Sequence, residues 1–229
     1  MALTRAKLTT GWLKRIIQQV PELETYLLSK TELQASIQQT LQQRPTSKYA
    51  EHTGVWIFAY GSLIWNPILQ YGARRKGTIY GWHRCFCMRT PAGRGTPACP
   101  GLTLALERGG SCCGIAYCIA TDHISTELLL LWQREMIVGS YIPRWVKVWT
   151  DGQTVDAIAF TINPQHPLYA PKLSIIEMAA SISRAQGALG SCTEYLLQTI
   201  AGLANNGITD RGLLKVRDRI RDMQINTGG

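Results

Sequence analysis

The sequence predicts an α+β fold, in which a mainly antiparallel sheet or barrel lies between a helical N-terminal extension and a group of C-terminal helices. Three observations lead to this expectation. Apolar residues recur at helical spacing before residue 45, short apolar runs bounded by turn residues fill residues 55–162, and helical spacing returns after residue 172. Because strands do not alternate regularly with helices, a doubly wound parallel sheet is not expected.

The first 44 residues are expected to be helical. Two sets of apolar residues recur there every four positions, Leu8, Trp12, Ile16 and Val20, then Leu33, Ile37 and Leu41. Pro21 separates the two sets, and Arg-Pro-Thr-Ser-Lys at 44–48 is typical of a linker. We therefore divide the chain into a helical extension over residues 1–50 and a main domain over residues 51–229.

The middle of the chain is expected to form strands. Residues 55–60 are wholly apolar and end at Gly61, as in a central strand. The other expected strands are 78–89, 102–107, 114–120, 141–150 and 154–162. The last two flank Asp151 and Gly152, a strong hairpin signal.

Four helices are expected in the second half of the chain, over residues 125–138, 172–186, 191–205 and 210–223. Gly139 follows the first of them, in the position where glycine commonly ends a helix. Ser191 and Glu194 form the pattern of a capping box at the start of the third.

The composition limits the class of protein. Hydrophobic residues make up 45% of the chain and charged residues 17%, which favours a folded globular protein. No apolar run approaches the ~18–20 residues that a membrane span needs, and the first residues lack the features of a signal peptide. We therefore expect a soluble protein of the cytoplasm that is neither exported nor bound to a membrane.

Cysteine and histidine usage indicates neither disulfides nor a metal site. The seven cysteines are an odd number and lie mostly in strand-like segments, so we expect reduced thiols. No Cys-x-x-Cys pair occurs and the four histidines are scattered, so the spacing of a zinc site is absent and no metal is expected.

The net charge of +9 is unevenly distributed. Residues 71–110 carry seven Arg and Lys against one acid. These bases are spread through apolar strands rather than gathered on a helix, so we expect no nucleic-acid partner. A solvated face and an electropositive cleft for a small anion both stay open.

Glu135 is the most unusual residue of the expected helix over 125–138. At 100° per residue it falls in the middle of an apolar stripe formed by Leu128, Leu131, Trp132 and Val138. A buried glutamate needs either a partner or a cavity, and burial raises its pKa toward the ~6–7 suited to a general base.

Two explanations of Glu135 follow from the residues alone. It could be a catalytic carboxylate, or it could form a structural ion pair, for example with Arg84 or Arg89. Its neighbours Gln133 and Arg134 project elsewhere on the helical wheel and are expected to reach solvent.

The end of the strand at residues 55–60 is a second candidate site. Gly61 permits a positive φ and a sharp turn, after which backbone N–H groups can converge on an anion. Tyr60 and Ser62 add hydroxyl groups. An ordinary turn is the alternative, and Tyr-Gly-Ser-Leu-Ile at 60–64 is not the Gly-x-Ser-x-Gly of a nucleophile elbow.

Six stretches of the sequence together resemble the ChaC family of γ-glutamylcyclotransferases. They are WIFAYGSLIWNP (56–67), GWHRCFCMR (81–89), RGTPACPGLTLALE (94–107), GIAY (114–117), LWQREMIVGSYIPRWV (131–146) and AIAF (157–160). Members of this family often have Gly before the tyrosine of the loop, where this sequence has Ala59. The C-terminal helices resemble the family less specifically, and the helical extension carries no motif of it.

The resemblance implies a γ-glutamylcyclotransferase-like mixed β-barrel with surrounding helices, and cofactor-free cleavage of glutathione to 5-oxoproline and cysteinyl-glycine. The substrate's α-amine would attack its own γ-carbonyl carbon, so the enzyme would need no nucleophile. Glu135 matches the family's acid/base glutamate. The substrate-binding loop of the family matches Tyr60, Gly61, Ser62, Leu63 and Ile64. Tyr141 is a further candidate hydrogen-bonding group, and a tyrosine packed in the core is an equal alternative.

Other functions stay open. A cysteine-dependent hydrolase could use Cys85 with His83, two residues away on the same strand face. A non-catalytic binding or regulatory protein, or a cyclotransferase for other γ-glutamyl amides, would also fit the sequence. Arg89 could meet a substrate carboxylate, pair with Glu107 or lie at the surface. The sequence does not indicate the oligomeric state.

Overall fold

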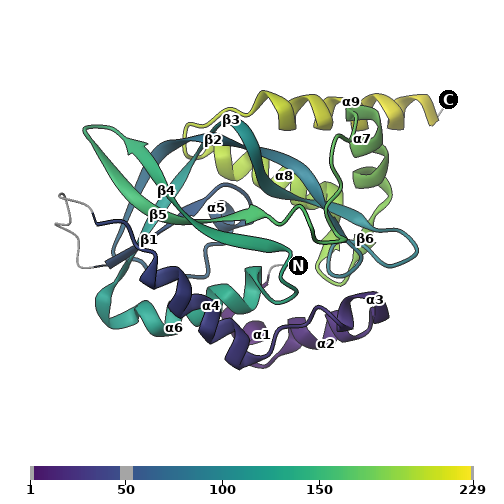
Figure 1. Ribbon diagram of the computed structural model, residues 1–229. Coiled ribbons are helices and arrows are strands. Elements are labelled where there is room, and N and C mark those ends of the chain that lie inside the picture. Colours follow the sequence, from purple (N-terminus) through teal and green to yellow (C-terminus); the bar gives the residue numbers. More distant parts are fainter. Residues whose placement is uncertain (1–2, 47–53, 228–229) are drawn as a thin grey trace.

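The computed structural model describes residues 3–46 and 54–227 (Figure 1). Its strands are β1 (Gly54–Ala59), β2 (Ala73–Thr90), β3 (Gly101–Ala120), β4 (Tyr141–Thr150) and β5 (Gln153–Ile162), with the short pair β6 (Gln186–Gly187) and β7 (Gly190–Ser191). Its helices are α1 (Arg5–Thr9), α2 (Trp12–Gln18), α3 (Pro21–Glu24), α4 (Lys30–Gln42), α5 (Ser62–Trp65), α6 (Ile124–Glu135), α7 (Ile175–Arg184), α8 (Cys192–Ala204) and α9 (Arg211–Thr227), with a 3-10 turn η1 (Thr121–His123) before α6.

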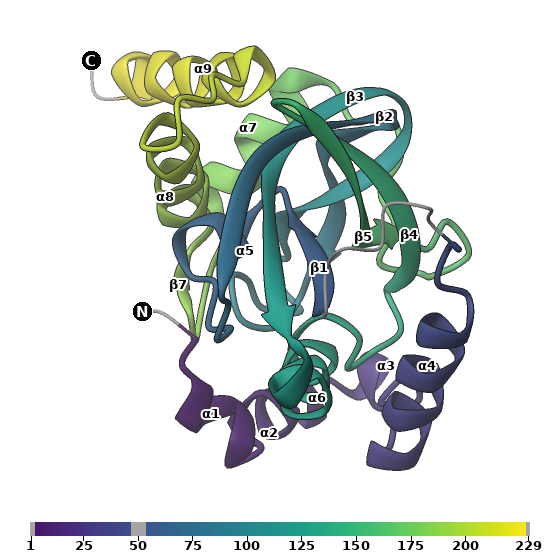
Figure 2. The same ribbon diagram turned by 90° about the vertical axis from the view of Figure 1, so that its left-hand side faces the viewer.

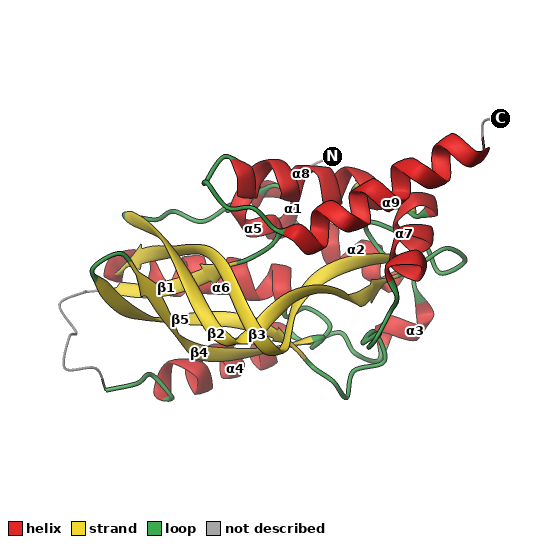
Figure 3. Cartoon of the chain, turned by 90° about the horizontal axis from the view of Figure 1, so that it is seen from above, coloured by secondary structure: helices red, strands yellow, loops and turns green. Residues whose placement is uncertain are grey.

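The five long strands form a closed barrel in the order β1-β3-β2-β4-β5. Strands adjacent in this order are antiparallel except where the barrel closes, where Trp56 and Ile57 of β1 pair with β5 in parallel. An additional parallel pairing joins Leu106 of β3 to Thr161 of β5. Figure 3 shows the strands, in yellow, with helices on both sides. The predicted α+β architecture with a mixed barrel is therefore confirmed.

Strand β1 lies at the centre of the core. All six of its residues are buried, which explains why its sequence is an unbroken apolar run rather than an alternating one. It pairs with β3 along its whole length. The predicted hairpin of β4 and β5 also forms, with Thr150 opposite Gln153 at the turn.

Strand β3 is longer than the sequence indicated. Separate strands were expected over 102–107 and 114–120, whereas the structure has one continuous strand from Gly101 to Ala120. Gly109 and Gly110 take φ angles of +105° and +65°, and the pairing with β2 changes register there, between Tyr80 and Trp82. The two glycines therefore form an irregularity inside a strand that β2 supports on both sides, and not a break between two strands.

Helix α6 ends at Glu135, earlier than the expected end at residue 138. The Ile137 carbonyl accepts the N–H of Leu28 at 2.9 Å, and Ile137 and Val138 pack against Ile17, Val20 and Leu23. Residues 136–138 therefore contact the N-terminal helices instead of continuing the helix. Gly139, with φ +65°, closes the turn that follows, and its N–H donates to the Met136 carbonyl.

The three C-terminal helices cover one side of the barrel, and Figure 2 shows α8 and α9 beside the strands. Each lies within or close to its expected range. At the start of α8 the Ser191 hydroxyl accepts the N–H of Glu194 at 3.0 Å, and the Glu194 carboxylate accepts from Arg94 at 2.7 Å. Helix α8 also packs on α5, which follows β1 directly.

The N-terminal extension lies at the opposite side, next to α6 (Figure 1). It is divided into four helices, and the Pro21 expected to separate two helices is the first residue of α3. Leu33 and Ile37 of α4 are buried as their spacing predicted. The Trp132 indole donates to Ser36 at 3.0 Å and fixes α4 against α6. Residues 47 and 48 of the expected linker, and the expected domain boundary between residues 50 and 51, lie outside the described residues.

Within residues 3–46 and 54–227, no helix has both the length and the apolar character needed to cross a membrane.

Candidate active site

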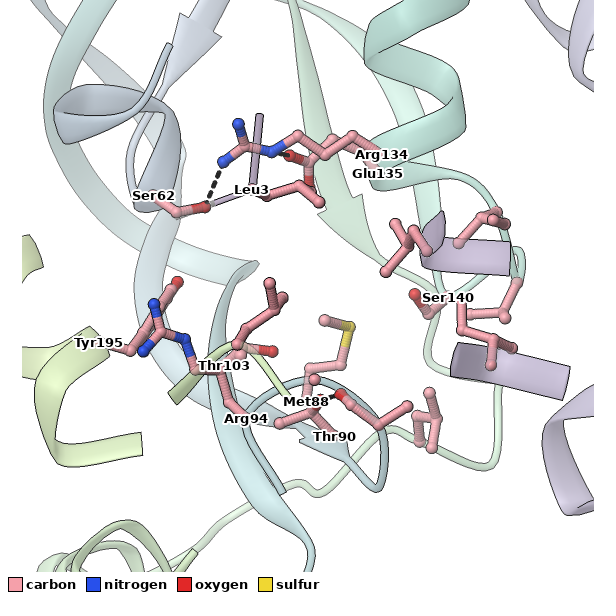
Figure 4. Close-up of a pocket in the computed structure, with 18 of the residues that line it drawn as sticks. Leu3, Ser62, Met88, Thr90, Arg94, Thr103, Arg134, Glu135, Ser140 and Tyr195 are labelled. Atoms are coloured by element: carbon pink, nitrogen blue, oxygen red, sulfur yellow. Dashed lines mark hydrogen bonds and ion pairs between the residues drawn. The ribbon is translucent and has the colours of Figure 1, made fainter. Parts of the chain in front are cut away.

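Two cavities meet at Glu135. The smaller, of about 30 Å³, is lined by Tyr60, Gly61, Ser62, Leu63, Leu104, Glu135, Tyr141, Phe160 and Tyr195. The larger, of about 190 Å³, shares Ser62, Glu135, Tyr141 and Tyr195 with it. Figure 4 shows Ser62, Arg134 and Glu135 on one side of the larger cavity and Arg94, Thr103, Met88 and Thr90 on another.

Glu135 is the last residue of α6, and its side chain is only 14% exposed. Burial raises the pKa of this carboxyl above its ordinary value, because the ionised form loses solvation. The Arg134 guanidinium opposes the shift, since its Nε lies 2.9 Å from Oε1 of Glu135. The carboxyl is thus poised to exchange a proton nearer neutral pH than a solvated glutamate would.

Arg134 is turned toward the site, and the expectation that it reaches solvent was wrong. Its side chain is 6% exposed and donates to Ser62 Oγ at 2.8 Å and to the Asn66 carbonyl at 2.7 Å. The helix ends at Glu135, so the long Arg134 side chain has three nearby acceptors that offset the cost of its burial. The cation beside Glu135 is therefore its own neighbour rather than Arg84 or Arg89.

The loop after β1 turns without a positive φ. Gly61 has φ −134° and ψ −127°, so the left-handed turn considered from the sequence does not occur. Glycine avoids a close contact instead: a Cβ there would lie 3.2 Å from the hydroxyl oxygen of Tyr195, so Tyr195 would have to move slightly. Ser62 and Leu63 then begin the one-turn helix α5, where the first N–H groups have no partner within the helix.

Arg84 of β2 fixes the position of this loop through hydrogen bonds. Its Nε donates to the Tyr60 carbonyl, its Nη2 donates to the Cys113 carbonyl at 2.7 Å, and its Nη1 pairs with Asp210 at 2.5 Å. Asp210 also accepts the N–H of Leu213 at the start of α9. Because the Arg84 side chain is only 3% exposed, these charge-assisted bonds tie the loop firmly to the C-terminal helices.

Three tyrosine hydroxyls surround the smaller cavity. Tyr60 donates to the Phe160 carbonyl at 2.6 Å, and Tyr141 donates to the Leu104 carbonyl at 3.0 Å. Burial raises the pKa of both well above the usual tyrosine value, and it raises the pKa of Tyr195 to about 12. All three stay protonated at neutral pH, so the carboxyl of Glu135 is the group among these four that can take up a proton.

The structure brings most of the sequence-predicted site residues together. Tyr60, Gly61, Ser62, Leu63, Tyr141 and Glu135 all line the smaller cavity. Ile64 lines neither cavity; it is buried beside Gly202 of α8. Arg89 is an exposed residue that lines the larger cavity, whereas Glu107 accepts a hydrogen bond from Tyr169.

Sequence reasoning missed three residues of the site, Arg134, Tyr195 and Arg94. Arg94 is buried, donates to the Ser191 carbonyl at 3.0 Å, and lies over the ring of Tyr195 at 5.9 Å. Helical spacing could have placed Tyr195 on the buried face of α8. No local pattern indicates that this face meets the end of β1.

One cluster outside both cavities contains side chains of the types that commonly bind metal ions. His83 and Glu107 pair across β2 and β3, and their ligand atoms and Cys85 Sγ lie within 4.8 Å of one another. Such proximity across strands is invisible to sequence spacing. The groups already contact each other: Oε2 of Glu107 lies 3.6 Å from Cys85 Sγ and 3.7 Å from His83 Nε2.

The cysteines do not support thiol catalysis. All seven are free, and none of them lines either cavity at Glu135. A hydrogen bond with Cys87, together with burial, raises the pKa of the Cys85 thiol. Burial raises the pKa of Cys112 and Cys192 to about 11. These shifts favour the thiol over the reactive thiolate.

Known proteins resemble this chain over most of its length. The chain is 43% identical over 191 residues to the glutathione-specific gamma-glutamylcyclotransferase of Escherichia coli, a match that covers 83% of this chain and 80% of that protein. Since residues 55–229 make up less than 83% of the chain, this match reaches into the N-terminal extension. The human glutathione-specific gamma-glutamylcyclotransferase 1 is 31% identical over 163 residues, which covers 67% of this chain and 73% of that protein.

A solved structure with a similar fold agrees with these sequence matches. The crystal structure of a yeast gamma-glutamyl cyclotransferase specific to glutathione matches with a TM-score of 0.68 at 21% identity, and the match covers 75% of this chain and 97% of that one. The model of the ChaC-like protein family matches residues 55–223, which include both cavity-forming motifs and all five long strands except Gly54. The chain therefore belongs to the ChaC-like protein family.

Proposed function

We propose that this protein is a γ-glutamylcyclotransferase that cleaves glutathione to 5-oxoproline and cysteinyl-glycine. The substrate's α-amine nitrogen bonds to its own γ-carbonyl carbon, and the amide bond from that carbon to the cysteine nitrogen breaks. The proton lost by the amine is delivered to the departing nitrogen, so no water is consumed. Membership of the ChaC-like family and the names of its relatives support this assignment.

The position and burial of Glu135 are the observation that most directly supports the proposal. Glu135 has a nearly buried carboxyl at the junction of two cavities, with a pKa raised by burial. A group of this kind takes a proton from the ammonium and returns it to the leaving nitrogen. We assign Glu135 both steps.

The smaller cavity fits the ammonium end of the substrate. Its volume of about 30 Å³ has room for a group of the size of a water molecule or an ammonium. The hydroxyl protons of Tyr60 and Tyr141 are committed to backbone carbonyls, so their oxygens are left to accept. Together with the Glu135 carboxylate, these acceptors would hold the amine within reach of the γ-carbonyl carbon.

The loop after β1 is suited to donate hydrogen bonds to the substrate. Ser62 Oγ accepts from Arg134, so the Ser62 hydroxyl proton is available to a substrate oxygen. Ser62 and Leu63 line the cavity at the start of α5, where the first N–H groups have no partner within the helix. We propose that Gly61, Ser62 and Leu63 bind the γ-glutamyl group through these donors, while Tyr60 and Ile64 set the position of the loop.

The reaction as written needs no cofactor or metal, because the substrate supplies the nucleophile, the electrophile and the leaving group. We further propose a cytoplasmic location, which the seven free cysteines support. We propose that residues 51–229 form the catalytic domain and that residues 1–50 form an extension of it. We also propose that glutathione is the substrate and that the protein has no nucleic-acid partner.

The purified protein tests this function with glutathione and, in parallel, γ-glutamyl-alanine. Release of 5-oxoproline from glutathione with equal release of cysteinyl-glycine supports the proposal. Release from γ-glutamyl-alanine alone would indicate a cyclotransferase for other γ-glutamyl amides. A folded, monodisperse sample that releases 5-oxoproline from neither substrate would overturn the proposal and favour a binding protein.

A further inference from the structure

The larger cavity has one wall that comes from the N-terminal helices. Leu3, Leu13, Ile17 and Leu23 line it together with Glu135 and Tyr141. These four leucine and isoleucine side chains precede residue 55, where the match to the family model begins. The extension therefore reaches the same cavity as the carboxyl that carries the proposed chemistry.

The wall is anchored at its first helix by an ion pair between Arg5, which is 39% exposed, and the buried Glu127. Nη1 and Nη2 of Arg5 donate to the two carboxylate oxygens of Glu127 at 2.6 and 2.8 Å, and Glu127 is 1% exposed. Arg5 also donates to the Ile68 carbonyl at 2.8 Å, and the Gln70 N–H donates to Glu127 at 3.0 Å. Such a two-point charge pair fixes α1 on α6 in one orientation.

Further contacts anchor the wall close to the catalytic helix end. Asn66, which follows α5, donates to the Leu3 carbonyl at 2.8 Å. Ile17 and Leu23 pack in one buried cluster with Ile137 and Val138, which directly follow the end of α6. The position of the wall is thus fixed relative to both Glu135 and the β1 loop.

We infer that residues 3–24 form the outer wall of the subsite for the leaving group, and that this wall restricts the leaving group to a small amine such as a dipeptide. The inference rests on the proposed function: if the α-amine occupies the smaller cavity, the departing half of the substrate extends into the larger one. The lining of that cavity combines the apolar wall with the polar residues Thr90, Thr103 and Arg89. A γ-glutamyl compound with a short, partly apolar leaving group fits this division.

Selectivity toward S-substituted glutathiones measures the effect of the wall. We compare kcat/KM for glutathione with that for S-methyl- and S-benzylglutathione, in the full-length protein and in Ile17→Ala and Leu13→Ala. Because space for a few extra carbon atoms changes discrimination by about tenfold or more in an apolar pocket, each variant should raise the S-benzyl to glutathione ratio by about that factor. S-methylglutathione should change less.

Ile37→Ala is the matched control, since Ile37 is a buried isoleucine of the same extension that lines neither cavity. It should lower the melting temperature and leave the substrate ratio at its original value. Leu13→Phe gives the opposite test: Leu13 is only half-buried, so the variant should fold, narrow the cavity and raise the KM for glutathione with little change in kcat.

The outcomes separate the two proposals. If the original protein releases 5-oxoproline from glutathione, but Ile17→Ala and Leu13→Ala shift the substrate ratio no more than Ile37→Ala does, the wall does not select the leaving group. An unchanged KM in Leu13→Phe would contradict the inference independently. If the original protein has no cyclotransferase activity, the proposed function fails instead.

Discussion

The two cavities at Glu135 are built from different parts of the chain. The smaller one is walled by the loop after β1, by β3–β5, by the end of α6 and by α8. Its Tyr60 and Tyr141 hydroxyls are fixed by hydrogen bonds to backbone carbonyls. The larger one has an apolar wall supplied by Leu3, α2 and α3. We therefore propose a division of roles, in which the β1 loop, the barrel and the end of α6 supply the chemistry and the extension selects the size of the substrate.

The largest effect is expected for Glu135→Gln, which should abolish proton transfer at the smaller cavity and leave the shape of both cavities unchanged. The amide is nearly isosteric but accepts and returns no proton, so kcat should fall by about 10²–10⁴-fold. Steady-state release of 5-oxoproline measures the loss. A variant that remains folded and keeps near-original turnover would exclude Glu135 as the proton carrier.

Arg134→Gln tests the contacts by which Arg134 joins Glu135 to Ser62 of the β1 loop. Removing hydrogen bonds to charged and polar partners should lower kcat/KM by about ten- to hundredfold. Because the Arg134 charge lowers the pKa of Glu135, the acidic limb of the pH profile should also move to higher pH. Arg134→Lys keeps the charge but not the bonding geometry, and should therefore lower kcat/KM with a smaller shift of the limb.

Ser62→Ala should have a more modest effect on binding. Losing one hydrogen bond to the substrate should raise KM by about three- to tenfold and change kcat less. Ser181→Ala is a suitable control, because the Ser181 hydroxyl donates to the Pro100 carbonyl and lines neither cavity. A fall in kcat with unchanged KM would assign Ser62 to the transition state instead.

The smallest effect is expected on stability. The pKa of Glu135 is raised in the folded protein, so the fold loses stability as pH rises from ~4.3 through that raised value. Glu135→Gln does not titrate, so its melting temperature minus that of the original protein should increase over this window and then level off. Each kcal/mol corresponds to about 2–4 °C for a chain of this length. A difference that decreases with pH would mean that Arg134 stabilises the ionised carboxyl more than burial destabilises it.

Local periodicity was sufficient to predict the strand and the helix that carry the proposed chemistry. The apolar run of β1 and the apolar stripe around Glu135 follow from burial on all sides, which leaves a direct record in the sequence. The continuity of β3 was missed because glycines usually mark breaks, and only the pairing with β2 shows that Gly109 and Gly110 lie within a strand.

Contacts between distant segments account for what the sequence did not indicate. Adjacent residues on a helix point about 100° apart, so periodicity placed Arg134 in solvent when Glu135 was placed inside. Its burial depends on acceptors from Ser62 and Asn66. The spacing of Leu8 and Val20 likewise predicted a buried face on the extension, but a pattern of apolar residues does not say which surface they cover.

The most direct test of the central claim is a ¹³C NMR titration of the Glu135 carboxyl in the full-length protein without substrate, assigned by its absence in Glu135→Gln. Its pKa is then compared with that of the acidic limb of kcat/KM for glutathione, which reports the free enzyme. We predict that the two values coincide and lie above the ~4.3 of a solvated glutamate. A Glu135 pKa at or below that value, or an acidic limb set by a different group, would contradict the assignment of Glu135 as the acid and base.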